Sequence, residues 1–359
     1  MTSDNHQMKI LMLISSPFQY WCALEYLHQM GGRVSITIVN AATFCENSML
    51  QIEAMHKFAK PESVKLLSIP KEGSLASRIG AYSDLITVFA NGAFSTVLIG
   101  DLRQLWMQDI ACNINADNVV LVDDGAATNV FEKFIIRPSD YMLPVSMHSD
   151  NPERKSLAWE LKSSLGIFHN PTKFHLFSIF EFNDSKHSIR NTLSLLRQQF
   201  ALHDHNENVE RHFIGSPVCE KGLLDSKRYY DILSHAAKSH DAKTSLIYFA
   251  HRAEDIKSKA QILSDLGYTV EFHDQPYELA CASQGRMPEK VLGLHSTSLF
   301  NMKILSGNAC EAICYMLNEN ELAAMGTRYY GSDRFTLRDH IESIYDRFEE
   351  FGITTLNLQ

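Results

Sequence analysis

The chain has 359 residues, of which 45% are hydrophobic and 21% charged, with a formal net charge of -9. This length suits two domains, and the composition is typical of a globular protein with buried cores. The negative charge excludes a global attraction to nucleic acid, and no local block of Lys and Arg supplies one. The seven cysteines are scattered, which predicts free thiols in a reducing compartment.

The amino terminus lacks the basic flank and cleavage site of a signal peptide. No stretch reaches the ~18 apolar residues that a membrane span needs. We therefore expect a cytoplasmic protein without an integral membrane segment. Peripheral association with the inner face of the cytoplasmic membrane stays open, although the acidic last helix offers no attraction to anionic lipid.

The first half alternates short β-rich runs with helical stretches. Strands are predicted at 9–14, 34–39, 63–69, 96–100 and 119–123, and helices at 19–29, 47–59, 75–90 and 104–115. This alternation predicts a parallel sheet with right-handed crossovers. Ser15-Ser16-Pro17 follows the first strand in place of a Gly-x-Gly-x-x-Gly fingerprint, so a nicotinamide or flavin enzyme is not expected.

The second half repeats the pattern after a less regular middle. Helices are predicted at 156–165 and 185–200, and the polar segment 203–212 is the candidate linker, with its histidines in a solvated loop. Strands follow at 212–216, 245–250, 268–272 and 291–295, and helices at 227–238, 253–266, 276–283, from 298 onward, and at 337–351. The predicted fold class is α/β of the GT-B type, with Rossmann-like domains at 1–205 and 206–359 facing a cleft and the last helix packing back on the first domain as an option.

Asp123-Asp124-Gly125 ends one buried-looking strand. Because ligands of open α/β sheets bind beyond the carboxyl ends of the strands, one of these carboxylates is a candidate general base for an acceptor hydroxyl. A simple strand-end turn explains Asp and Gly equally well. No metal is expected, because the Asp-x-Asp of metal-dependent glycosyltransferases is absent.

His251-Arg252 ends a second such strand. The imidazole could donate a proton or hydrogen bond to a departing phosphate, and the guanidinium could bind the same anion. A lone histidine is more often a core or surface residue, so the position at the strand end carries the functional interpretation.

Two hydroxyl-rich segments complete the candidate set. Ser296-Thr297-Ser298 opens a helix, where hydroxyl and backbone N–H groups bind phosphate, although helix capping explains the same residues. The segment 15–19, with Ser16 and Gln19, forms the first strand-to-helix turn and is a candidate binding loop for the nucleotide sugar.

In this order, these signals resemble the bacterial GT-B sialyltransferases, namely the lipooligosaccharide sialyltransferases and the related capsular polysialyltransferases. Those enzymes carry an acid-acid-Gly motif, a His-Pro motif and a later Ser-Ser/Thr pair. The matches are Asp123-Asp124-Gly125, His251 and Ser296-Thr297, with Arg252 in place of the proline. The segments 15–25 and 214–224 are similar to the family's openings of its two domains.

The resemblance implies an inverting, metal-independent and cofactor-free transfer of sialic acid from CMP-sialic acid to a glycan hydroxyl. Asp123 would be the base, with Asp124 as the alternative, and His251 would assist the leaving phosphate together with Arg252, Ser296, Thr297 and Ser298. Glu278 would hold the ribose, while Gly100, Asp101, Asp124 and Gly125 would line the acceptor pocket. Two alternatives stay open: transfer from another nucleotide sugar, and a catalytically inactive nucleotide- or sugar-binding relative. The acceptor glycan, the linkage and the oligomeric state are not determined by the sequence.

Overall fold

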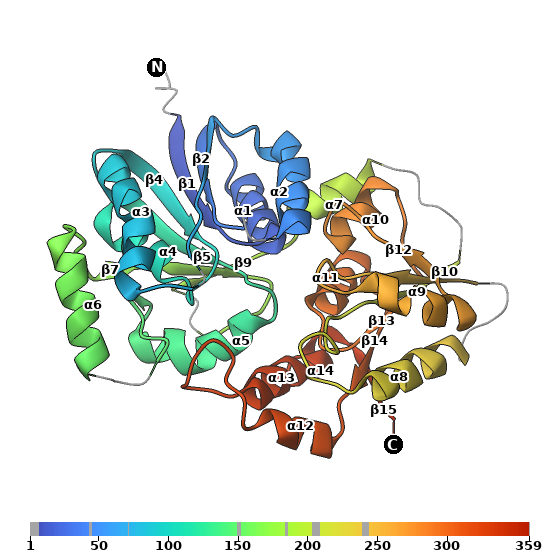
Figure 1. Ribbon diagram of the computed structural model, residues 1–359. Coiled ribbons are helices and arrows are strands. Elements are labelled where there is room, and N and C mark those ends of the chain that lie inside the picture. The colour runs from blue at the N-terminus through green and yellow to red at the C-terminus, as the bar shows by residue number, and fades with distance from the viewer. Residues whose placement is uncertain are drawn as a thin grey trace. The chain divides into compact units, whose positions relative to one another are not determined.

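The protein folds into two compact units. The computed structural model describes residues 7–42, 45–70, 72–148, 152–183, 186–202, 209–238 and 244–358. Unit 1 consists of Met1–Asn191 and Gly331–Phe335, and unit 2 of Thr192–Tyr330 and Thr336–Gln359. The elements of both are shown in Figure 1.

Unit 1 is built on a seven-stranded sheet in which every pair of neighbouring strands is parallel. Its carboxyl-terminal strand halves are buried and apolar, as expected for a parallel sheet covered on both faces. The strand order is β3 (Ser63–Leu66), β2 (Val34–Asn40), β1 (Met8–Ile14), β4 (Ala93–Ile99), β5 (Asn115–Val122), β8 (His175–Ser178) and β9 (Ser188–Arg190). A separate antiparallel pair joins β6 (Met142–Leu143) to β7 (Thr172–Lys173).

The helices of unit 1 form two groups on opposite sides of this sheet (Figure 1). α1 packs on α2, whereas α3 packs on α4 and α6. The helices are α1 (Pro17–Met30), α2 (Glu46–Ala59), α3 (Leu75–Ala90), α4 (Leu105–Asn113), α5 (Ala127–Phe131), η1 (Glu132–Ile136), η2 (Arg137–Ser139) and α6 (Pro152–Ser164).

Unit 2 contains a six-stranded, wholly parallel sheet. The strand order is β12 (Thr269–Glu271), β11 (Ser245–Phe249), β10 (Glu210–Ile214), β13 (Lys290–Gly293), β14 (Glu311–Met316) and β15 (Thr354–Asn357). Its helices are α7 (Ser194–Ala201), α8 (Ser226–Lys238), α9 (Ile256–Asp265), α10 (Tyr277–Ser283), α11 (Thr297–Ser306), α12 (Glu319–Met325), α13 (Leu337–Tyr345) and α14 (Phe348–Phe351).

The core of unit 2 is rich in aromatic rings. Phe213 of β10 lies parallel to Tyr248 of β11, with ring centroids 5.9 Å apart and an interplanar angle of 6°. Leu337 and Ile341 of α13 belong to the same buried cluster. α13 therefore packs in the core of unit 2.

The chain first crosses between the units at 191/192 and returns to unit 1 for Gly331–Phe335, whereas the sequence placed a single boundary at 205/206. α7 belongs to unit 2 because it packs on α10. Residues 203–208 of the predicted linker at 203–212 lie outside the described residues. The last residue of that segment, His212, is a fully buried residue of β10.

Two predicted helices differ from the structure. Within 185–200, Ser188–Arg190 form β9 and the helix begins only at Ser194, because pairing with β8 overrides the local helical pattern. The helix predicted at 337–351 ends at Tyr345 and restarts at Phe348. The rings of Phe348 and Phe351 then lie 5.4 Å and 5.0 Å from that of Phe300 on α11.

Candidate functional site

In unit 1 the strand order reverses between β1 and β4, and ligands of α/β sheets bind at such a reversal. The turn after β1 carries Ser16 and Gln19, and Gly100-Asp101 follows β4. Ser16 caps α1, since its hydroxyl accepts the Gln19 N–H at 3.2 Å. These residues place a polar cluster at the carboxyl edge of the sheet.

Asp124 is the accessible acid of this cluster, with a side chain 15% exposed. It accepts a hydrogen bond from Gln19 Nε2 at 2.8 Å and pairs with the guanidinium of Arg103. Asp101, which is buried, holds Arg103 from the other side through Nε at 2.9 Å. Gln19, Asp101, Arg103 and Asp124 thus form one network, of which the sequence analysis missed Arg103.

Asp123 lies in a different environment. It is 1% exposed, and its Oδ2 accepts the backbone N–H of Ile179 at 2.7 Å, just beyond β8. Burial raises the pKa of Asp123 to about 7. A general base needs both a suitable pKa and access to the substrate. Asp123 has a pKa suited to accepting a proton at neutral pH, whereas Asp124 has access to a ligand.

Three positions at the cluster require glycine, either because a side chain would be too close to a neighbour or because φ is positive. A Cβ on Gly100 would lie 2.4 Å from Oε1 of Gln19, and Gly125 has a φ of 66°. Gly331, also with a positive φ, lies against Arg103, where a Cβ would be 2.6 Å from its Cδ. The segment Gly331–Phe335 thus completes the unit 1 cluster, although it lies more than 200 residues further along the chain.

In unit 2 the strand order reverses between β10 and β13, and His251 follows β11, the neighbour of β10. Nδ1 of His251 accepts the N–H of Ala253 at 3.1 Å, so Nε2 carries the proton of the neutral ring. Burial, followed by Arg252, Lys221 and Lys259, lowers the pKa of His251 to about 3. At neutral pH the imidazole is therefore uncharged and presents an N–H donor.

Glu254 anchors the turn that carries His251. Its carboxylate, fully inaccessible, accepts the His251 backbone N–H at 2.7 Å, the Tyr248 hydroxyl at 2.6 Å and Lys259 Nζ at 2.7 Å. Lys259 also binds Glu220 at 2.7 Å. Glu254 is not among the predicted site residues, although its network fixes the turn that carries His251.

Lys221 marks a cationic region near two imidazoles. It lowers the pKa of both His251 and His295, although burial is the larger cause at each, and the pKa of His295 falls to about 4. The hydroxyl of Ser296 caps α11 and accepts the N–H of Ser298 at 3.3 Å. Neutral imidazoles, a helix start and nearby cations form a set of donors suited to a phosphate.

Two other predicted residues of unit 2 lie in different settings. Arg252 is partly exposed and stands next to His251. Glu278 is 6% exposed near the start of α10, and one of its oxygens accepts a hydrogen bond from Asn301 Nδ2 at 2.7 Å. Arg252 therefore has access to a ligand, whereas Glu278 is largely covered.

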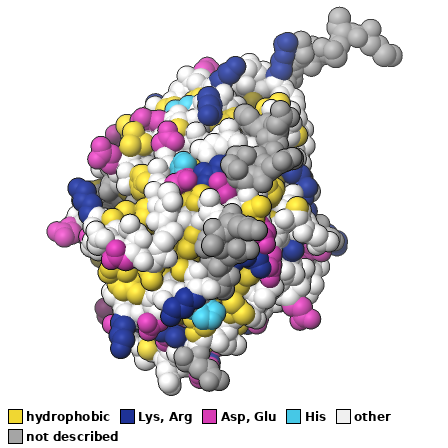
Figure 2. Space-filling view, turned by 90° about the vertical axis from the view of Figure 1, so that its right-hand side faces the viewer, with side chains coloured by type: hydrophobic (Ala, Val, Ile, Leu, Met, Phe, Trp, Pro, Cys, Tyr) yellow, Lys and Arg dark blue, Asp and Glu magenta, His cyan; other side chains and the backbone are white. Residues whose placement is uncertain are grey.

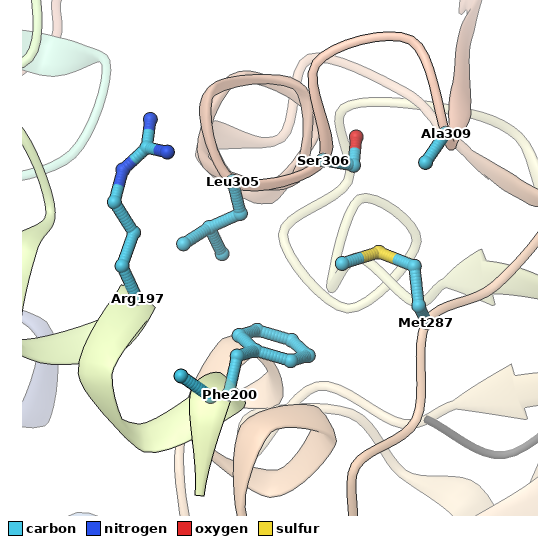
Figure 3. Close-up of a pocket in the computed structure, with 7 residues that line it drawn as sticks. Arg197, Phe200, Met287, Leu305, Ser306 and Ala309 are labelled. Carbon is cyan, nitrogen blue, oxygen red and sulfur yellow. The ribbon is translucent and has the colours of Figure 1, made fainter. Parts of the chain in front are cut away.

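The described residues line two notable cavities. One, in unit 1, has a volume of about 640 Å³ and includes Arg103 in its lining. The other, in unit 2, has a volume of about 510 Å³. Figure 3 shows Arg197 and Phe200 of α7 on one side of it and Leu305, Met287, Ser306 and Ala309 on the other. None of the predicted site residues lines the unit 2 cavity.

On the face seen in Figure 2, acidic and basic side chains are interspersed. Among the described residues, no group of His, Cys, Asp and Glu has a metal-binding arrangement. No helix in that part of the chain combines the length and hydropathy of a membrane-spanning segment. No disulfide bond joins the cysteines of the described residues.

The fold is similar to solved structures at low sequence identity. A putative UDP-N-acetylglucosamine 2-epimerase from Listeria monocytogenes is 12% identical, with a TM-score of 0.51 and coverage of 96% of this chain and 90% of that one. A sialyltransferase from Photobacterium damsela is 9% identical, with a TM-score of 0.49 and coverage of 98% and 82%. UGT89C1 from Arabidopsis thaliana, complexed with UDP, is 9% identical, with a TM-score of 0.48 and coverage of 97% and 91%.

No family model matches the chain, and no curated protein matches it. Of these three structures, the putative epimerase is the one with a TM-score above 0.5, and at 12% identity this similarity shows the fold alone. The predicted fold class, α/β with two Rossmann-like units of the GT-B type, is confirmed.

Proposed function

We propose that the protein is a glycosyltransferase that moves sialic acid from CMP-sialic acid to a glycan hydroxyl, with inversion and without a metal. The observation that carries this proposal is the donor set of unit 2, where His251 and the start of α11 at Ser296 follow two strand ends and Lys221 influences both His251 and His295. Such a set suits the phosphate of a nucleotide leaving group. Transfer from another nucleotide sugar is equally consistent with the fold.

In this proposal unit 2 binds the donor. His251 gives its Nε2 proton as a hydrogen bond to the departing phosphate, and the charge of that phosphate favours full protonation of the ring. Arg252, Ser296, Thr297 and Ser298 supply further donors to the same oxygens. Glu278 would need to reach the ribose with the oxygen that Asn301 does not occupy.

Unit 1 would bind the acceptor with Gly100, Asp101 and Gly125 around the acid pair. Asp124 is accessible, so we propose that it takes the proton of the acceptor hydroxyl, with Arg103 and Gln19 fixing its orientation. Asp123, which was the first choice from sequence, would support the turn from its buried position. We propose a cytoplasmic location, which cell fractionation with an antibody to the protein would test.

A thermal-shift panel with CMP, UDP, GDP and ADP, with and without EDTA, tests the donor. A ligand that binds only the folded state stabilises it by ~2.7 kcal/mol at a hundredfold excess over the dissociation constant. We expect CMP to raise the Tm selectively, EDTA to have no effect, and His251→Ala to abolish the shift. His235→Ala is the matched control, because His235 is an exposed histidine of unit 2. Selective stabilisation by another nucleotide would indicate a different donor, and no response to any nucleotide would refute the proposal.

Turnover of CMP-sialic acid with a panel of glycan acceptors tests the chemistry. General-base catalysis contributes about 10²- to 10⁴-fold, so Asp124→Asn should reduce kcat by that factor while the variant remains folded by circular dichroism. A comparable loss confined to Asp123→Asn would make Asp123 the base. Binding of CMP without turnover in the wild type would favour the inactive relative.

A further inference from the structure

The unit 1 cavity lies among α3, α4, α6 and the segment 144–148, helices that stand together in Figure 1. Its volume of about 640 Å³ falls in the range of small-molecule sites. All the residues that line the cavity belong to unit 1. The inference about its ligand therefore does not depend on the proposed transfer reaction.

The lining combines apolar and cationic side chains. Its buried apolar part includes Ile79, Leu102, Trp106, Val145 and Met147. Its charged members are Arg78, Arg103 and Lys155, joined by His148 and His169, and no carboxylate occurs among the described lining residues. A ligand that fits this lining has an apolar body and a negatively charged group.

Trp106 forms part of the buried wall of the cavity. The side chain is 1% exposed, and its indole N–H meets no acceptor among the described residues. Leaving a buried donor unpaired costs ~1–3 kcal/mol, and because the nitrogen itself is inaccessible, the indole contributes apolar surface to the wall rather than a hydrogen bond to a ligand. The neighbouring Gln108 is satisfied, since it donates to Leu102 O at 2.6 Å and accepts from Val145 N at 2.7 Å. Gln108 therefore fixes this part of the wall to Leu102 and Val145.

Trp159 and Arg103 define two further sides. Trp159 is 51% exposed, with the ring of His169 at 5.3 Å, and offers an aromatic surface to an apolar group. Arg103 belongs both to this lining and to the ion pair with Asp124. A ligand in the cavity therefore lies next to the carboxyl edge of the sheet.

We propose that this cavity binds an amphipathic anion, that is, a phosphate or carboxylate joined to an alkyl or aromatic group. The anionic group lies among Arg78, Arg103 and Lys155, and the apolar part contacts the aliphatic wall and Trp159. The inference concerns binding in unit 1, so it stands or falls independently of CMP binding.

Isothermal titration calorimetry of the full chain with four probes tests it. Octyl phosphate and phenyl phosphate carry both features, with a lipid-like and a compact aromatic body respectively. Inorganic phosphate carries only the charge, and octyl glucoside, used below its micelle concentration, only the alkyl chain. We expect one of the first two to bind at least about tenfold more tightly than either single-feature probe, a difference of ~1.4 kcal/mol. The tighter of the two identifies the kind of apolar body.

Arg78→Ala and Arg33→Ala form a matched pair, because both arginines are exposed in unit 1 and only Arg78 lines the cavity. Arg78→Ala should weaken binding of the preferred probe at least about fivefold and Arg33→Ala should leave it unchanged. Ala158→Phe, which fills the lining from α6, should abolish binding. Equal affinity for all four probes, equal effects of the two arginine variants, or unaltered binding in Ala158→Phe would each overturn the proposal.

Discussion

Gly215 lies directly against the carboxylate of Glu254: a Cβ at position 215 would stand 2.1 Å from Oε2. The same Cβ would meet the carbonyl oxygen of Phe249 at 2.8 Å and the hydroxyl of Tyr248 at 2.9 Å. The residue that follows β10 therefore has no side chain, because the buried carboxylate occupies that space. This contact links the first strand of unit 2 to the turn that carries His251.

Gly215→Ala should destabilise the protein by about 1–3 kcal/mol, the usual cost of overpacking a buried site. Urea unfolding followed by circular dichroism measures the change. Gly80→Ala is the control, since a Cβ on this exposed residue of α3 meets nothing within 4 Å. That variant should gain about 0.5–1 kcal/mol, the advantage of alanine over glycine within a helix. A neutral Gly215→Ala would contradict the close contact.

Glu254→Ala should cost about 3–5 kcal/mol, because it leaves the buried ammonium of Lys259 with Glu220 alone and removes the acceptor of Tyr248. The comparison is Glu311→Ala, which removes the partner of Lys290 from an ion pair whose carboxylate is 44% exposed. That pair should contribute less than about 1 kcal/mol. Similar losses of stability in the two variants would show that burial of the Glu254 network contributes little to the free energy of unfolding.

Asp123 should make the protein less stable as the pH rises from about 4 to 7. Its pKa is near 4 in the unfolded chain and about 7 in the folded one, so the folded state binds more protons in this interval. The slope approaches -1.4 kcal/mol per pH unit for this group. Asp123→Asn removes it, so the variant should gain stability relative to the wild type between pH 5 and 8. Parallel pH profiles in chemical denaturation would exclude the raised pKa.

The titration of His251 should make the protein more stable as the pH rises, which is opposite to the effect of Asp123. Its pKa is about 3 in the folded protein and ~6.5 in the unfolded chain, so the unfolded state binds the proton between these values. Stability from this group is complete above pH ~6.5 and is lost as the pH falls toward 3. His251→Gln should therefore lose less stability than the wild type between pH 7 and 5, and a stability profile parallel to that of the wild type would contradict the lowered pKa.

Much of the first unit could be predicted from local sequence. The apolar strand runs and the amphipathic helices between them, such as 75–90, are encoded within short windows, and right-handed crossovers then give a parallel sheet. The strands β6, β7, β8, β9, β14 and β15 escaped prediction. Ser188–Arg190 form a strand because β8 provides a partner, and no local pattern encodes that partner.

The sequence by itself determined the positions of the chemical groups: Asp123-Asp124, His251 and Ser296-Thr297 each follow a strand, since the strands and their ends are local features. Only the tertiary structure decided the state of those groups. It buried Asp123, paired Asp124 with Arg103, neutralised His251 and brought Gly331 to Arg103. Burial and charge pairing depend on residues distant in sequence, and these determine pKa and access.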